Sequence, residues 1–164
     1  KANSLAEIDL LEQFAKNQSY RKFCLVIEYT QNEISIENKV AENIIIIESE
    51  QSKGWAIENQ SSYSIAGWVT PNSYYGEHYL RDLINASIYE PEAEGWAKAL
   101  ENDVFGYGVP TLLSGALWKM KKFLNYYIDA KADDSITYSK LYLADSEQFE
   151  GNIDSEYKQL RGAE

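Results

Sequence analysis

The sequence contains few of the residues that build disulfides and metal centres. Among its 164 residues there is one cysteine, Cys24, and one histidine, His78. A single cysteine excludes an internal disulfide, and one cysteine with one histidine cannot supply the four side chains of a structural zinc site. Cys24 lies in the apolar run 23–27, so we expect it to be a small buried core residue.

Long hydrophobic runs and positive charge are also scarce. The longest run of aliphatic residues is Ile44–Ile47, far short of the ~18 apolar residues that cross a membrane. Fifteen bases against 26 acids give a net charge of −11. A surface of this sign repels phosphates and anionic lipids, so we expect neither nucleic acid nor membrane as a partner. The lone thiol and the lack of a signal-like segment favour a cytoplasmic location.

Catalytic and cofactor-binding signatures are missing as well. There is no G-x-x-x-x-G-K-[ST] or G-x-G-x-x-G phosphate cradle, no G-x-S-x-G elbow and no calcium-binding loop. We therefore predict no cofactor, no metal and no catalytic residue. The alternative is a small hydrolase or transferase, and it would have to use His78, which otherwise is an ordinary helix histidine.

The residues that are present predict one folded domain. Hydrophobic residues make up 45% of the chain, which excludes intrinsic disorder, and no linker or repeat divides residues 1–164. Ser4 and Glu7 have the spacing of a capping box. Leu5, Ile8, Leu11, Phe14 and Ala15 follow at helical spacing and predict an amphipathic helix at the start of the chain.

From Tyr20 to Thr70 the apolar pattern changes to that of strands. The segments that we expect to be strands are 23–29, 34–37, 43–49, 54–59 and 63–70. Because the turns between them are short, they predict an antiparallel meander. A sixth strand is expected within 136–143.

Helical spacing returns after Pro71. We expect a helix over 75–88 with Asn72 or Ser73 as its cap, and a second helix that begins at Pro91 and continues to about Val104. Gly106–Gly108 is expected to be a loop. Val109–Asp129 has the clearest apolar face and is expected to be the helix that backs the sheet, and 153–160 a short closing helix. The predicted fold is a single α+β domain, with a largely antiparallel sheet of about five to six strands packed against several helices.

Tyrosines and acids are the remaining clue to function. The chain has 13 tyrosines, several of them beside acids, and residues 129–164 carry nine acids against four bases. Tyrosine is enriched at protein interfaces, and an acidic patch attracts a basic protein. Equally, the tyrosines could fill the core and the acids could serve solubility. If a partner binds, we expect it to contact Asp129, Asp133, Asp134, Tyr138, Tyr142, Asp145, Glu147 and Glu150.

In size and composition the chain resembles bacterial toxin-immunity proteins, which are small, acidic, rich in aromatic residues and free of catalytic motifs. The resemblance implies a non-catalytic protein that binds and blocks a cognate toxin, often a basic nuclease. A secretion chaperone for an effector is an alternative of similar size and acidity. It would act as a dimer that holds an extended segment of its client.

Overall fold

In the computed structural model, helix α1 (Leu5–Asn17) opens the chain and is capped, as predicted, by Ser4. The structure describes residues 1–30, 43–98, 106–107, 115–129, 141–144 and 149–150. Ser4 Oγ accepts a hydrogen bond from the Glu7 N–H at 3.2 Å, while the Glu7 carboxylate accepts one from the Asn3 N–H at 2.7 Å. Leu5, predicted on the buried face, is 58% exposed. The residues of α1 that are buried are Ile8, Leu11, Phe14 and Ala15.

Two of the predicted strands pair in parallel. Strands β1 (Leu25–Tyr29) and β2 (Ile44–Glu48) form a two-stranded sheet, with Leu25 opposite Ile44. They match the segments predicted at 23–29 and 43–49. The expected antiparallel meander is wrong here, because β1 and β2 are parallel, and parallel neighbours need a crossover connection instead of a tight turn.

The main sheet has five strands and mixed pairing. In sheet order its members are β3 (Ile65–Gly67), β7 (Ala116–Lys119), β5 (Gly95–Lys98), β8 (Leu141–Ala144) and β6 (Gly106–Tyr107). All neighbours are antiparallel except β5 and β8, which are parallel. A third, small sheet pairs β4 (Tyr74–Tyr75) with β9 (Phe149–Glu150). The α+β class is confirmed, but the largely antiparallel sheet is not.

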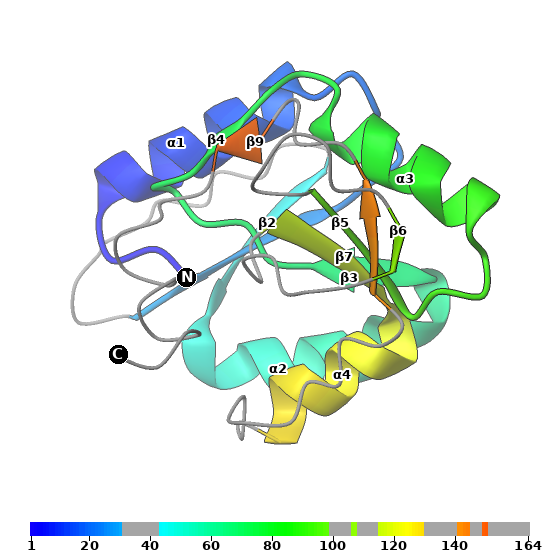
Figure 1. Cartoon of the computed structure of the whole chain (residues 1–164). Helices are drawn as coiled ribbons and strands as arrows, with labels where there is room; N and C mark the ends of the chain where they lie inside the picture. The colour runs from blue at the N-terminus through cyan, green and yellow to red at the C-terminus, as the bar shows by residue number, and fades with distance from the viewer. Residues whose placement is uncertain (31–42, 99–105, 108–114, 130–140, 145–148, 151–164) are drawn as a thin grey trace, which may run out of the picture.

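Helices cover both sides of the strands. Besides α1 they are α2 (Ser49–Asn59), followed by the short 3₁₀ helix η1 (Gln60–Ser62), α3 (Tyr79–Tyr89) and α4 (Met120–Asp129). Figure 1 shows α1 and α3 on one side of the strands and α2 and α4 on the other. Helix α3 contacts β5 and β8, and α4 contacts β3, β7 and α2. None of the described helices is long and apolar enough to cross a membrane.

Three expected elements have the wrong type. The predicted strand 54–59 is the second half of α2, and the predicted helix from Pro91 contains strand β5 at 95–98. The expected long helix 109–129 is strand β7 over 116–119 and helix α4 over 120–129. In each case a short apolar run is compatible with either period, and its neighbours in the fold decide which one forms.

Other boundaries move. Helix α3 begins after His78, not after Asn72 or Ser73, and residues 74–75 form β4 instead of its first turn. Residues 106–107 are strand β6, where a loop was expected. The strand predicted within 136–143 is β8, described from Leu141. The strand expected at 34–37 and the closing helix expected at 153–160 lie outside the described residues.

Strand β5 separates two hydrophobic clusters. Trp96 belongs to the larger cluster, with the buried face of α1 and with Tyr75 and Tyr79, whereas Ala97 belongs to the smaller one with Trp118. Successive side chains of a strand point to opposite faces, so the residues of β5 alternate between the two clusters. This strand is buried along its whole length, and the core is built on both of its faces.

Candidate functional site

A cavity of about 180 Å³ lies between β1 and β3, which belong to different sheets. We call it the seam cavity. Its walls come from β1, β3, α2 and α4. Since β3 is the end strand of the five-stranded sheet, the cavity occupies the place where that sheet stops and the parallel pair begins.

Among the described residues, five aromatic side chains line the seam cavity: Trp55, Tyr63, Trp68, Phe123 and Tyr127. Phe123 stands between two of the others, with its ring centroid 4.5 Å from that of Trp68 and 5.4 Å from that of Tyr127. Trp55 and Tyr63 form a second pair at 6.2 Å. Walls of this kind bind apolar or cationic groups through their ring faces.

Glu28 supplies a carboxylate to the wall of the seam cavity. The Tyr127 hydroxyl donates a hydrogen bond to Glu28 of β1, and its oxygen lies 2.7 Å from Ser52 Oγ. Ser52 is buried, and its Oγ also lies 2.8 Å from the Ser49 carbonyl oxygen. Burial, reinforced by the bond to Glu28, raises the pKa of Tyr127 to about 12. Tyr127 therefore keeps its proton at neutral pH and holds the Glu28 side chain at the cavity wall.

Cys24 lies between the seam cavity and a second cavity of about 240 Å³, and it lines both. It is half-buried, so the prediction of a fully buried core thiol is only partly right. Burial raises the pKa of the Cys24 thiol, and a hydrogen bond with Tyr63 opposes that shift. A thiol that holds its proton is a weak nucleophile, which gives no support to a reactive cysteine at this place.

His78 contacts a serine and a carboxylate. Its Nδ1 lies 2.8 Å from Ser19 Oγ, and its Nε2 lies 3.2 Å from Glu77 Oε1. These distances satisfy the contact between nucleophile and base that hydroxyl activation requires. However, the Glu77 side chain is 68% exposed, and none of the three residues lines either cavity.

The surroundings of His78 give it a role in joining two helices. Gln18, which is fully buried, donates to the Gly76 carbonyl at 2.9 Å and accepts from the Leu80 N–H at 3.1 Å. The Ser19 N–H donates to the Glu77 carbonyl at 2.7 Å. Together with the Ser19–His78 bond, these contacts tie the end of α1 to the first turn of α3, and His78 is the residue that precedes that helix.

Few of the predicted partner-binding residues fall within the described ranges. Tyr142 is in β8, where it is partly buried and packs against the larger core cluster. Asp129 is the last residue of α4, and Glu150 pairs with Tyr74 in the small sheet. The remaining five residues, Asp133, Asp134, Tyr138, Asp145 and Glu147, lie outside the described residues.

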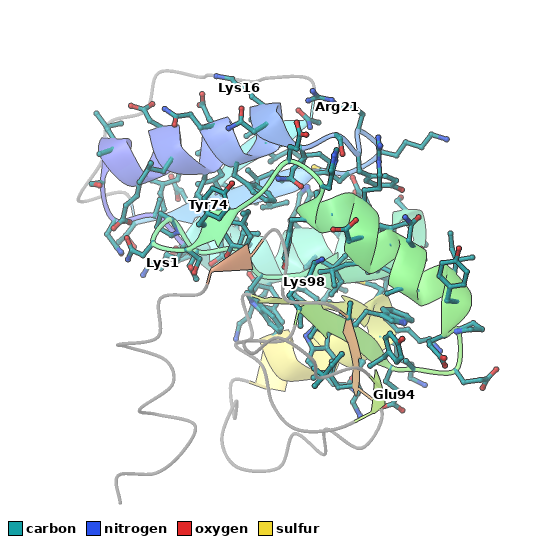
Figure 2. The ribbon with its side chains drawn as sticks, turned by 45° about the horizontal axis from the view of Figure 1, so that its top comes forward. Lys1, Lys16, Arg21, Tyr74, Glu94 and Lys98 are labelled. Atoms are coloured by element: carbon teal, nitrogen blue, oxygen red, sulfur yellow. The ribbon has the colours of Figure 1, made fainter. Side chains whose placement is uncertain are left out.

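A different acidic and apolar surface is well described. Residues 88–94, which we call the acidic edge, comprise Ile88 and Tyr89 at the end of α3 and the connection to β5, which contains three glutamates. Ile88 is 69% and Tyr89 is 81% exposed. Glu92 is exposed, whereas Glu94 is half-buried and pairs with Lys122 at 2.9 Å. Figure 2 shows Glu94 at the periphery of the molecule. The acids were visible in the sequence, but the exposure of the two apolar side chains was not.

The described residues contain no group of three or more side chains able to hold a metal ion. Comparison with known protein families, with curated proteins and with solved structures found no match. Function is therefore inferred from the residues of this chain.

Proposed function

We propose that the chain is a non-catalytic binding protein that neutralises a basic protein partner, in the manner of an immunity protein that blocks a toxin. The observation that carries this proposal is the acidic edge, where two large apolar side chains are exposed beside the exposed Glu92 and the half-buried Glu90. Exposed aromatic anchors next to acids suit a partner with a positive surface around apolar pockets.

The net charge of −11 supports the same proposal. It speeds the encounter with a basic partner by electrostatic steering, and this effect weakens as salt is added. Gly95, directly after the acidic edge, pairs with Leu141, so the acidic edge joins β5 next to the strand that carries Tyr142. A partner that contacts the acidic edge is thus close to one of the residues predicted from the sequence.

The test measures association with the product of a neighbouring toxin gene at several salt concentrations. We expect Tyr89→Ala to raise Kd at least about tenfold, because buried aromatic anchors carry much of the binding free energy at an interface. Reversing the exposed Glu92 to lysine should slow association and reduce its dependence on salt. The same reversal at the exposed Glu58, on α2, is the matched control. Lack of any salt-sensitive association would rule the proposal out.

A secretion chaperone is the alternative from the same class of binding proteins. Such chaperones act as dimers, so a strict monomer in solution, measured by light scattering, argues against this alternative.

A hydrolase built around Ser19 and His78 is the second candidate from another class, and the contact of 2.8 Å between Ser19 Oγ and His78 Nδ1 favours it. Full biological activity of the His78→Ala variant would exclude this candidate. Since His78 also joins α1 to α3, the folding of the variant is checked by its thermal unfolding midpoint.

A further inference from the structure

We propose that the seam cavity binds a small organic cation, with its ammonium or guanidinium group at Glu28 and its apolar body between the aromatic rings. This goes beyond the proposed function and does not depend on it, because the cavity and the acidic edge have no residue in common.

The aromatic walls favour a positive charge over a neutral ligand. Ring faces carry negative electrostatic potential, so a cation within about 6 Å of a ring centroid is attracted to it. Trp68, Phe123 and Tyr127 are a continuous series of rings in contact, and Trp55 with Tyr63 adds a second group. An apolar ligand gains from burial alone, whereas a cation gains from both burial and these faces.

Glu28 supplies the counter-charge. It lines the cavity, is only partly accessible to solvent and is held in place by the Tyr127 hydroxyl. A carboxylate has about four lone-pair sites, so the bond from Tyr127 leaves sites for a cationic donor. Lys1 also lines the cavity and is exposed, so its charge is screened by water and opposes the ligand only weakly.

The size of the cavity sets the size of the ligand. An apolar cavity of about 150 Å³ holds one benzene ring. The seam cavity, at about 180 Å³, therefore accepts one ring or a comparable aliphatic body with a short aminoalkyl group. A free amine and the lysine or arginine side chain of a protein present this same chemistry, and the experiment separates the two sources.

The experiment compares 2-phenylethylammonium with 2-phenylethanol, which has the same body without the charge. Binding is followed by calorimetry and by the fluorescence of Trp55 and Trp68, which line the cavity. We expect the cation to bind about tenfold more tightly than the alcohol. A short lysine-containing peptide forms the second arm, and binding of the peptide without the free amine assigns the site to a protein side chain.

Matched variants locate the binding. Glu28→Gln keeps an acceptor for Tyr127 and removes the charge, so it should weaken binding of the cation about tenfold and leave the alcohol unaffected. Glu58→Gln makes the same change on α2 at an exposed position that does not line the cavity, and should have no effect. If Glu28→Gln does not fold, Trp55→Leu removes an aromatic ring from the cavity wall while keeping an apolar side chain, and it should reduce the preference for the cation. Trp68 remains as the fluorescent reporter in this variant.

Two results would overturn the proposal. One is equal affinity for the cation and the alcohol, which would make the seam cavity a plain apolar pocket. The other is no saturable binding of either the amine or the peptide by the folded protein. Neither result bears on the acidic edge, so the proposed function is tested separately.

Discussion

Lys98 and Asp82 form an ion pair between β5 and α3, with Lys98 Nζ 3.0 Å from Asp82 Oδ2. The lysine side chain is fully buried, whereas the aspartate side chain is 30% exposed. Figure 2 shows Lys98 in the interior of the molecule. A buried ammonium is tolerated only where anionic or polar groups replace its hydration, and Asp82 is such a group for Lys98. Because the two residues belong to β5 and α3, the pair connects the central strand of the main sheet to this helix.

The asymmetry of the Lys98–Asp82 pair predicts unequal effects of removing either charge. Asp82→Asn leaves the buried ammonium without this carboxylate and should lower the free energy of unfolding by about 3 kcal/mol. Lys98→Met keeps an apolar side chain of similar length and leaves an aspartate that water can reach, so it should change stability by less than about 1 kcal/mol. Urea unfolding of both variants measures the two values. A greater loss for Lys98→Met would contradict this account.

Two glycines are expected to respond to the same substitution with opposite signs. A Cβ atom on Gly95 would overlap the ring of Trp118, whereas one on Gly54 meets nothing within 4 Å. Gly95→Ala should therefore destabilise the protein by about 1–3 kcal/mol through overpacking. Gly54→Ala, within α2, should stabilise it by about 0.5–1 kcal/mol, because glycine is a poor helix former. Thermal unfolding of the two variants compares them. Destabilisation by Gly54→Ala would argue against a helix at this position.

The elements that were predicted correctly have local signals. Helix α1 has a capping box and an apolar face, and β1 and β2 are dense in aliphatic residues. Strand β5 and helix α2, two of the misread elements, lack such signals. Strand β5 is buried on both faces, so it shows no alternation of polar and apolar residues, and its sequence is compatible with a helix. Helix α2 buries only Ser52, so it has no apolar face for the sequence to reveal.

The candidate site could not be predicted for a different reason. The seam cavity takes Glu28 from β1, Trp55 from α2 and Phe123 from α4, which are far apart in the chain. No spacing rule connects them, because they meet only through the order and direction of the strands. The excess of aromatic residues was visible in the sequence and was interpreted as an interface or as core. The structure has tyrosines in both kinds of environment, since Tyr89 is exposed and Tyr79 is fully buried.

The start of α1 offers a test of the capping box. Ser4→Ala removes the hydrogen bond from the Glu7 N–H to Ser4 Oγ and should lower the free energy of unfolding by about 1 kcal/mol. The exposed Ser61, in η1, is the matched control, and Ser61→Ala should change stability by less than about 0.5 kcal/mol. Urea midpoints of the two variants give the comparison. Equal midpoints for both variants would show that the cap makes no contribution.

We expect the protein to lose stability at alkaline pH, because tyrosines in the seam cavity and in the core have raised pKa values. Burial, with the bond to Glu28, raises the pKa of Tyr127 from 10.0 to about 12, and burial also raises the pKa of Tyr63 and, to a greater extent, that of Tyr79. Because the pKa of the tyrosine is higher in the folded state, the unfolded chain loses the tyrosine proton at a lower pH than the folded chain does. The stabilising effect is therefore complete below pH 10 and is lost for Tyr127 as the pH rises through about 12.

The variant Tyr127→Phe isolates the contribution of Tyr127 to this alkaline loss. It should flatten the fall in unfolding free energy above pH 10, and it should cost about 1 kcal/mol at neutral pH, where the hydrogen bond to Glu28 is lost. Tyr89→Phe, at a residue that is 81% exposed, should leave the fall unchanged. Urea unfolding at a series of pH values measures the slope for each protein. A slope in Tyr127→Phe equal to that of the parent chain would mean that Tyr127 does not couple proton loss to unfolding.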